Sequence, residues 1–350
     1  MTAETLNIAV AGAGLIGQAH IEVIRQSPGL RLAAIADPSP AAKSLADRIG
    51  TPFFASLDAL LATQRPDGIV LATPNALHVP QALQCLEAGV AVLLEKPIAT
   101  TIREAEKLVA RAARGGPRVL IGHHRAHSPI MTLARSALAE GLLGRLVAIT
   151  GSAMFYKPDH YFEDGPWRIQ PGGGPILINM IHEVHNLRML CGEITAVQAM
   201  ASHATRGFAV EDTVAISLRF AGGALGSFLL SDTAASPHSW EQTSGENPAY
   251  AHYDDQNCYV VTGTQGSLAI PTMQLHRYPR AEDRSWWKAF EVSGLALDRE
   301  DPLRRQIRHF GEVIAGHAEP LVSARDGIKN LQVTEAIARA AASGQTIDLT

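Results

Sequence analysis

The stretch NIAVAGAGLIG, residues 7–17, decides the fold, because an apolar strand runs directly into a glycine-rich turn and then into a helix. Further short apolar runs follow, separated by segments with helical periodicity. Apolar strands that alternate with helices are typical of a parallel sheet covered on both faces. The expected strands are 7–11, 32–36, 68–72, 91–94 and 118–121, and the expected helices are 15–26, 40–49, 56–61 (capped by Ser56), 76–88 and 102–113.

The pattern changes after about residue 125, where several strands follow one another without intervening helices and predict a mainly antiparallel sheet. We therefore expect an N-terminal doubly wound Rossmann domain over 1–125 and a second domain with an open sheet over 126–350, with the last two helices able to pack back on the first. Residues 233–255 are too long for a turn and predict a functional loop or a mobile insertion. The expected strands are 145–155, 195–203, 211–220, 224–230 and 257–262, and the expected helices are 129–140, 175–190, 302–315 and 324–342.

The composition excludes several classes of protein. The 350 residues carry 30 Lys and Arg against 34 Asp and Glu, so a net charge of −4 argues against nucleic acid or an anionic membrane as the main partner. Three widely spaced cysteines form neither a disulfide framework nor a thiolate zinc site. The cysteine pattern favours a reducing cytoplasm, and no apolar run is long enough to span a membrane, so we expect a cytoplasmic protein.

The glycines at 12, 14 and 17 have the GxGxxG spacing of a dinucleotide-binding fingerprint, at the first strand-to-helix junction where the fingerprint requires it. Gly12 permits the tight turn, Gly14 lets the backbone approach a pyrophosphate, and Gly17 lets the helix pack on the strand. The free amides at the start of the helix, around Leu15 and Ile16, would bind the anion.

Asp37 follows the second strand, where a carboxylate accepts hydrogen bonds from the adenosine ribose and repels a 2′-phosphate. The position favours NAD over NADP. Two alternatives stay open: Asp37 is a turn residue before Pro38, or a cation at Arg31 or Lys43 accepts the phosphate of NADP.

Two motifs follow later strands of the same sheet. Thr73, Pro74 and Asn75 come after the strand at 68–72, and His78 lies one turn into the next helix. Open α/β sheets bind ligands at the carboxyl ends of their strands, so we expect these residues at the cofactor. A simple Pro-Asn turn with a helix cap would place them there as well.

Glu95, Lys96 and Pro97 follow the strand at 91–94, at the same edge. The apolar neighbours of Lys96 and a bound cofactor would exclude water, and desolvation favours the neutral amine. Such a lysine can exchange a proton with a substrate hydroxyl. The alternative is an ordinary Glu–Lys ion pair at a strand end.

These motifs, together with three glycines at 172–174 and the following His182, resemble the glucose-fructose oxidoreductase, inositol dehydrogenase and MocA (Gfo/Idh/MocA) family of NAD(P)-dependent oxidoreductases. The likeness extends over nearly the whole chain. It implies that Lys96 transfers the proton, that the peptide bond before Pro97 is cis, and that His182 polarises or deprotonates the reacting hydroxyl. The alternative for His182 is a buried histidine on a helix face.

The resemblance also implies contacts from the segment that crosses between the two domains and from a pair of residues shortly before the triple glycine. His124 would approach the nicotinamide, Arg125 would pair with a carboxylate, and Trp167 with Arg168 would reach the cofactor. The alternatives are surface or hinge residues for the first pair and a loop anchor for the tryptophan.

The chain departs from the family around its histidine. Many members carry an aspartate four residues before it, where this chain has Ile178, and another three residues after it, where this chain has His185. Asn179 supplies a neutral substitute, and its spacing of three from His182 predicts that Asn179, His182 and His185 share one helix face. Such a pocket is less acidic than that of family members with both aspartates, so an inositol-like substrate is less strongly expected.

Several further side chains have suitable chemistry. Tyr156, His160, Trp240 and Tyr253 are candidates to stack on or bond a cyclic substrate, or else belong to the core. We expect no catalytic metal, because the clustered histidines at 123, 124, 127, 182 and 185 lack the HExxH spacing of a zinc site.

The sequence therefore predicts reversible hydride transfer between NAD and a secondary hydroxyl of a sugar, cyclitol or polyol, with Asn179 and His185 holding neighbouring hydroxyls. Two alternatives use the same scaffold: a non-catalytic sensor of NAD or sugar, and an enzyme that cleaves glycosides through transient oxidation. An open sheet with one apolar face needs a cover, so we also expect a homodimer or homotetramer through the C-terminal sheet, as the resemblance implies.

Overall fold

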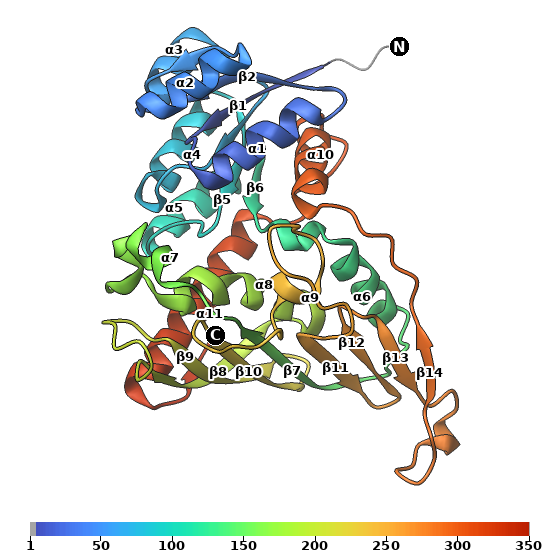
Figure 1. Ribbon diagram of the computed structural model, residues 1–350. Coiled ribbons are helices and arrows are strands. Elements are labelled where there is room, and N and C mark those ends of the chain that lie inside the picture. The colour runs from blue at the N-terminus through green and yellow to red at the C-terminus, as the bar shows by residue number, and fades with distance from the viewer. Residues whose placement is uncertain (1–4, 350) are drawn as a thin grey trace. The chain divides into compact units, whose positions relative to one another are not determined.

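The computed structural model describes residues 5–349, which pack as two compact units. The first unit runs to His127 and also contains Pro302–Leu331, and the second contains Ser128–Asp301 and the chain from Gln332 onward. Figure 1 shows the elements of both units. No helix within residues 5–349 is long and apolar enough to cross a membrane.

The first unit is built on a parallel sheet of six strands in the order β3-β2-β1-β4-β5-β6. Every residue of β4 and β5 is buried, as expected for a sheet with both faces covered. The predicted doubly wound parallel sheet is confirmed, although β3 was not predicted, because two residues are too short to show a pattern. The strands are β1 (Leu6–Ala11), β2 (Leu30–Ala36), β3 (Phe53–Phe54), β4 (Gly68–Leu71), β5 (Ala91–Glu95) and β6 (Val119–Gly122).

Helices alternate with these strands, and α2, α3 and α5 each begin with a side-chain cap. Ser56 Oγ accepts a hydrogen bond from the Ala59 amide, so the predicted cap is present, and Ser39 and Thr101 cap the neighbouring helices in the same way. A helix from the end of the chain, α10, packs against α1. The helices are α1 (Leu15–Gln26), α2 (Pro40–Ile49), α3 (Leu57–Thr63), α4 (His78–Glu87), α5 (Ile102–Ala112) and α10 (Pro302–Ile314).

The strand order reverses between β1 and β4, which pair with each other at the middle of the sheet. Consecutive strands lead outward from this point in both directions, so the loops after β1 and β4 diverge. A parallel sheet binds ligands in the crevice outside the carboxyl ends of its strands at such a switch point. The topology therefore places the glycine-rich turn and the Thr73–Asn75 motif at the same crevice.

The second unit contains a sheet of nine strands in the order β14-β13-β12-β11-β7-β10-β9-β8-β15. All neighbouring pairs are antiparallel except β7 and β10, so the predicted mainly antiparallel sheet is confirmed. The strands β12, β13, β14 and β15 were not predicted, because each is too short for an alternating pattern to stand out. The strands are β7 (Leu146–Met154), β8 (Ile194–Ser202), β9 (Thr213–Phe220), β10 (Leu225–Ser231), β11 (Tyr259–Gly263), β12 (Gly266–Ile270), β13 (Gln274–Arg277), β14 (Glu291–Gly294) and β15 (Ile347–Asp348).

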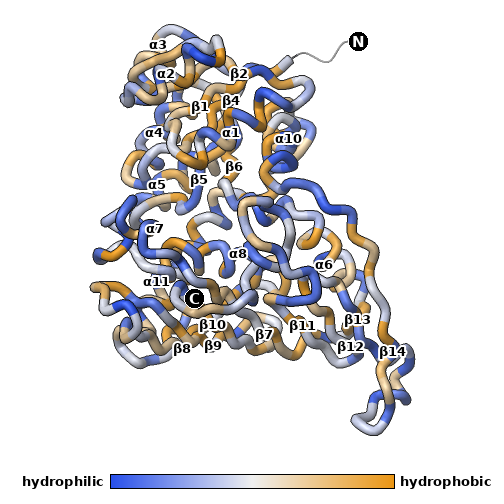
Figure 2. Tube along the Cα trace, viewed as in Figure 1, coloured by the Kyte–Doolittle hydropathy of each residue, from blue (hydrophilic) through white to orange (hydrophobic). Residues whose placement is uncertain are grey.

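One face of this sheet forms the core of the second unit with α6, α8 and the C-terminal half of α11 (Figures 1 and 2). Residues alternate between buried and exposed along β9, which is the pattern of a sheet covered on one side. Met200, Ala215 and Leu229 are paired in one row across β8, β9 and β10, and Met200 and Leu229 are exposed. The helices are α6 (Pro129–Ala139), α7 (Asp159–Glu163), α8 (Ile181–Cys191), α9 (Trp240–Thr243) and α11 (Ala324–Ser343).

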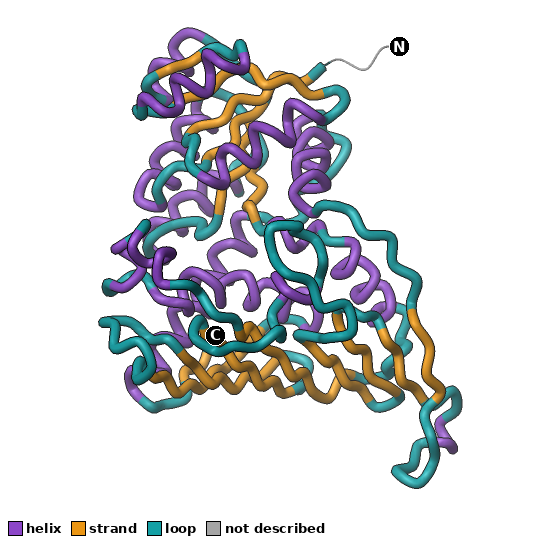
Figure 3. The backbone as a smooth tube through the Cα atoms, in the orientation of Figure 1, coloured by secondary structure: helices purple, strands orange, loops and turns teal. Residues whose placement is uncertain are grey.

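The segment 233–255 contains one short helix, α9, and is otherwise loop (Figure 3). Trp240 in this helix is 3% exposed, packs against Tyr259 of β11 and donates a hydrogen bond to Glu246. The middle of the segment is therefore anchored in the core by a large aromatic side chain.

Candidate active site

The glycine-rich turn has the geometry that a dinucleotide requires. Gly12 has a φ of +88°, and a Cβ there would lie 2.4 Å from the carbonyl oxygen of Ala72. A Cβ on Gly17 would lie 1.9 Å from the carbonyl oxygen of Gly12, whereas a Cβ on Gly14 would meet nothing within 4 Å. Two glycines are thus required by packing, and Gly14 instead leaves open space at the start of α1, where a pyrophosphate fits.

The helix begins at Leu15, whose side chain is 89% exposed, and Ile16 is 38% exposed. The start of α1 is therefore exposed at these two residues. Asp37, at the end of β2, accepts hydrogen bonds from the amide of Ala13 at 2.8 Å and of Ser39 at 2.7 Å. Burial opposes ionisation of this carboxyl, but these hydrogen bonds outweigh it and lower the pKa of Asp37. Asp37 is therefore an anion at neutral pH that braces the glycine-rich turn.

His78 connects the loops that follow β4 and β5. It is 1% exposed, and its ring lies 2.7 Å (Nδ1) from the Pro97 carbonyl oxygen and 2.9 Å (Nε2) from that of Thr73. Burial lowers the pKa of His78, and a neutral ring donates one of these two bonds. Thr73 also donates to Gln81 at 2.7 Å, and Pro74 and Asn75 begin a short 3-10 turn.

Glu95 ends β5 and Lys96 follows it, and the peptide bond between Lys96 and Pro97 is cis, as the resemblance implied. Glu95 is 6% exposed, and its Oε1 lies 2.8 Å from Nε2 of the buried His20 on α1. Burial would raise the pKa of Glu95, but the hydrogen bond and charge of His20, with Lys96 and His124, lower it. His20 was missed by sequence reasoning, because nothing in its helix pattern distinguishes it from other buried positions.

The residues after β6 lie beside this group. Burial and the neighbouring Arg125 lower the pKa of His124 to about 4, so this imidazole is neutral at physiological pH. Arg125 is 4% exposed. The first unit therefore gathers a carboxylate, a lysine and a neutral imidazole at the carboxyl ends of β5 and β6.

In the second unit, the triple glycine holds a loop together. A Cβ on Gly173 would lie 2.6 Å from the carbonyl oxygen of Arg168 and 2.7 Å from that of Trp167, so only glycine allows this approach. Trp167 is 54% exposed. The guanidinium of Arg168 lies 3.9 Å above the ring of Tyr161 and donates to the Tyr161 carbonyl oxygen.

The helix that carries His182 and His185 begins as a π-helical turn, Ile176–Met180, which was not predicted and contains Asn179. Such turns are frequent at functional sites. His182 is 8% and His185 4% exposed, and all of α8 except Met189 is buried. Tyr259 donates a hydrogen bond to Glu183, which ties this helix to β11.

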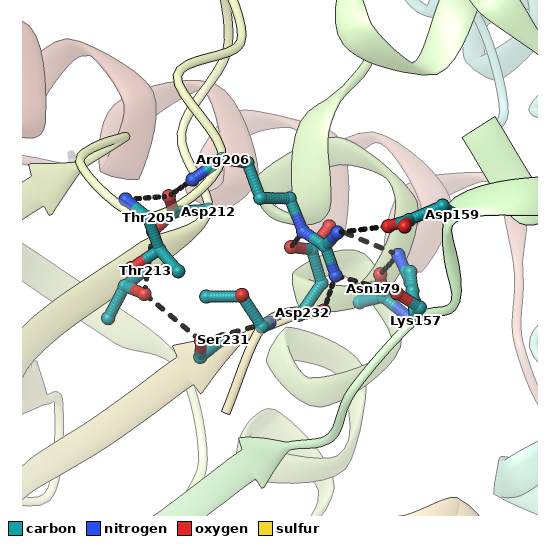
Figure 4. Close-up of polar contacts among 10 residues, drawn as sticks. Lys157, Asp159, Asn179, Thr205, Arg206, Asp212, Thr213, Ser231 and Asp232 are labelled. Carbon is teal, nitrogen blue, oxygen red and sulfur yellow. Dashed lines mark hydrogen bonds and ion pairs between the residues drawn. The ribbon is translucent and has the colours of Figure 1, made fainter. Parts of the chain in front are cut away.

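A polar cluster that sequence reasoning missed lies at the ends of β7 and β10 (Figure 4). Lys157 Nζ donates to Asn179 Oδ1 at 2.7 Å, and Arg206 Nε lies 3.1 Å from Asp232 Oδ1. The side chains of Lys157, Arg206 and Asp232 are 11%, 6% and 4% exposed. Position was the available signal, because Asp232 and Lys157 each lie two residues beyond the end of a predicted strand, 224–230 and 145–155.

The remaining candidates are more dispersed. Tyr156 is 57% exposed with the Arg206 guanidinium 5.1 Å from its ring, Tyr253 is 43% exposed, and His160 is exposed. Trp240 belongs to the core cluster. Within residues 5–349, no group of three or more His, Cys, Asp or Glu side chains is arranged to hold a metal ion.

Two family profiles match the chain. Residues 6–123 match the profile described as an oxidoreductase family with an NAD-binding Rossmann fold. Residues 131–269 match the GFO/IDH/MocA C-terminal domain. The first match contains the glycine-rich turn and Lys96, and the second contains His182.

Individual proteins are similar over most of their length. An inositol 2-dehydrogenase of Rubrobacter xylanophilus is 31% identical, over 97% of this chain and 92% of that protein. A 1,5-anhydro-D-fructose reductase of Ensifer adhaerens is 28% identical, over 84% of this chain and 83% of its own. The fold matches a crystal structure of an Agrobacterium radiobacter oxidoreductase in complex with NAD⁺, L-tartaric acid and magnesium, with a TM-score of 0.81, 18% identity and 98% of each chain covered. The profiles, the identity and the fold agree, and the chain belongs to the Gfo/Idh/MocA family of NAD(P)-dependent oxidoreductases.

Proposed function

We propose that this protein catalyses the reversible oxidation of a secondary hydroxyl of a sugar, cyclitol or related polyol with NAD. Residues 1–125 would bind the dinucleotide and residues 126–350 the substrate. The observation that carries the proposal is the placement of Lys96 directly after the fully buried β5. Glu95 before it is fixed by His20, and Pro97 after it is fixed by His78. The similarity to enzymes named for inositol and an anhydro sugar supports the substrate class.

The chain's own residues would manage the proton and the position of the substrate. NAD, when bound, accepts the hydride from the carbinol carbon. The amine of Lys96 takes the hydroxyl proton, and His182 holds and polarises the same oxygen. Asn179, His185, Arg125 and Tyr156 would bind the other substrate groups. Fixing these groups beforehand reduces the entropy that the reaction must lose.

The cofactor would be held by the loops at the carboxyl edge of the first sheet. Gly12, Gly14, Leu15 and Ile16 would receive the pyrophosphate, and Asp37 the adenosine ribose. Further contacts would come from the loops after β4, β5 and β6 and from the second unit. These contacts involve Thr73, Pro74, Asn75, His78, Glu95, Lys96, His124, Trp167 and Arg168.

NAD is preferred over NADP in this proposal, because the anionic Asp37 would repel a 2′-phosphate. The two cations of the NADP alternative, Arg31 and Lys43, already have other partners. Arg31 donates to Asn7 Oδ1 at 2.8 Å, and Lys43 Nζ lies 2.8 Å from Asp47 Oδ2. Their existing pairs support the choice of NAD.

The face of the nine-stranded sheet that α6, α8 and α11 do not cover would form the contact between subunits of a homodimer or homotetramer. Met200 and Leu229 are 74% and 47% exposed, and they lie in one row on this face. The same face has a hollow of about 480 Å³ lined by residues of β7, β8, β9 and β10. Exposed apolar residues around a concave surface are typical of a subunit contact.

The experiment that tests the function compares wild type with Lys96→Met on a panel of sugars, cyclitols and sugar acids, following NADH absorbance. We expect turnover to fall by about 10²–10⁴-fold or more, because general acid–base catalysis contributes that much. NADH affinity should change much less than turnover, because Lys96 is only one of many proposed cofactor contacts. Lys107→Met, an exposed change on α5, is the matched control. Retained turnover in Lys96→Met would remove this lysine from the mechanism, and no NAD reduction by wild type with any compound would count against the proposed function.

A further inference from the structure

Lys157 and Asp232 come from the ends of two neighbouring strands. β7 and β10 run parallel, so the chain leaves both strands at the same edge of the sheet. Beyond the strands the two segments remain paired, because the amide of Lys157 donates to the carbonyl oxygen of Asp232 at 2.9 Å and Tyr156 forms a bridge with Thr233. The backbone therefore fixes the base of both side chains.

The acidic groups of this cluster already have strong partners. Asp232 Oδ1 accepts from Arg206 Nε at 3.1 Å, whereas Asp232 Oδ2 lies 3.7 Å from Lys157 Nζ, beyond hydrogen-bond distance. Asp212 accepts from the amides of Thr205 and Arg206 and from the hydroxyl of Thr213. The hydrogen bonds of both aspartates therefore come from other groups (Figure 4), and Lys157, although it forms an ion pair with Asp232, retains hydrogen-bonding capacity.

Lys157 and Asn179 together offer only donors. The ammonium has three N–H groups, and among residues 5–349 only Asn179 Oδ1 accepts from it within hydrogen-bond distance. Because that oxygen faces the ammonium, the Asn179 amide presents its NH₂ group elsewhere, and no described residue accepts from it. Asn179 is half-buried, so its NH₂ group remains near solvent.

The surroundings of Lys157 make a charged ligand favourable. Its Nζ lies 4.9 Å from the ring centre of Tyr161 and 5.4 Å from that of Phe155. Burial lowers the pKa of Lys157 to about 8, with Arg168 and Arg206 in the same direction and Asp232 and Glu241 opposing. A buried ammonium without a full set of acceptors is costly, and an anionic oxygen would offset that cost.

We propose that Lys157 and Asn179 form a donor pair that binds a carboxylate of the substrate, so that the preferred substrates are sugar acids rather than neutral polyols. The inference rests on the proposed function, because Asn179 lies three residues before His182. A carboxylate only accepts hydrogen bonds and therefore matches both side chains, whereas a hydroxyl would leave its own proton without an acceptor at this pair. Lys157 is thus a specificity-determining residue in the second unit.

The test uses matched pairs of substrates, D-glucose with D-glucuronate and D-galactose with D-galacturonate, with NAD and the full chain. We expect the wild type to prefer each acid in kcat/KM. Lys157→Met should lower kcat/KM for the acids by about 10- to 100-fold, mainly through KM, because a hydrogen bond between two charged groups is lost. The neutral partners should change much less. Lys288→Met, a half-exposed lysine of the same unit, is the matched control.

Asn179→Asp is a second variant that keeps the size of the side chain and replaces its donor by an acceptor. It should pair with Lys157, repel the carboxylate and shift the preference toward the neutral sugars. The proposal is overturned if the wild type does not favour the acids, or if Lys157→Met affects acids and neutral sugars equally.

Calorimetric titration of the protein–NADH complex with the two acids separates this inference from the function it rests on. Acid binding that is weakened about tenfold or more in Lys157→Met supports the carboxylate site even if no compound is turned over. In that case it is the proposed oxidation that fails. Absence of acid binding to the wild type overturns the carboxylate site, while NAD reduction by neutral sugars would leave the proposed oxidation in place.

Discussion

His20 Nε2 lies 2.8 Å from Glu95 Oε1, and both side chains are buried inside the first unit. The lowered pKa of Glu95 keeps it ionised at neutral pH, so it accepts from the N–H of His20. This bond ties α1, which begins at the glycine-rich turn, to the residue before Lys96. The glycine-rich turn and Lys96 thus share one buried anchor.

Glu95→Gln should lower the free energy of unfolding at pH 7 by about 1–3 kcal/mol, because a charge-assisted bond becomes a neutral one. The folded pKa of Glu95 is below its usual value of 4.5, so its contribution is complete above that pH and is lost as the pH falls further. Urea unfolding from pH 7 to pH 3 measures both effects. The control is Glu22→Gln, which breaks an exposed ion pair on α1 and should change the free energy of unfolding little. Equal losses in the two variants would contradict the prediction.

Gly14→Ala and Gly17→Ala should separate binding from folding. A Cβ on Gly14 meets no protein atom within 4 Å, so the fold should persist while NADH affinity falls at least about tenfold through a clash with the pyrophosphate. A Cβ on Gly17 would lie 1.9 Å from Gly12 O, so this variant should lose about 1–3 kcal/mol of stability. Thermal unfolding and NADH fluorescence titrations measure the two quantities. Normal NADH binding by Gly14→Ala would show that the pyrophosphate lies elsewhere.

Asp37→Asn should reduce the preference for NADH over NADPH by about 10- to 100-fold, because the proposed contact of a negative charge with the ribose is lost. The amide oxygen can still accept from the Ala13 amide, so the glycine-rich turn should keep its shape. Titrations with both reduced cofactors measure the ratio. A ratio equal to that of the wild type would assign Asp37 to the turn alone.

Lys157→Met should stabilise the protein at pH 7 by about 1–3 kcal/mol, because burial of the ammonium lowers the pKa of Lys157 to about 8 from its usual 10.5. Between these values the unfolded chain binds the proton more tightly, so wild-type stability should rise as the pH increases from 8 to 10. The variant should lack this rise. Urea unfolding at pH 7, 8, 9 and 10 compares the two proteins, and destabilisation by the methionine at pH 7 would contradict the prediction.

Leu229→Lys should lower the mass of the particle in solution, because a symmetric contact through the sheet would bring like charges together. Light scattering on a sizing column measures the mass. Leu321→Lys, which adds the same charge at a half-exposed site in the first unit, is the control. A monomeric wild type, or an unchanged mass in Leu229→Lys, would remove this face from assembly.

The local motifs could be predicted because their chemistry depends on short spacings. A few consecutive residues specify each of these motifs: the glycine-rich turn, the helix cap at Ser56, and the end of β5 before Lys96. Short strands such as β12 and β13 were missed, because they pair through contacts with neighbouring strands. Their individual sequences are too short for an alternating pattern to stand out.

By itself, the sequence determined the two kinds of sheet, the position of the dinucleotide fingerprint and the order of the motifs along the chain. These follow from periodicity and from residues that are close in sequence. Only the tertiary structure brought His20 to Glu95 and Lys157 to Asn179, pairs separated by 75 and 22 positions. Such partners are chosen by strand order and burial, because an ionisable group placed in the interior must find its hydrogen bonds wherever the packed chain provides them.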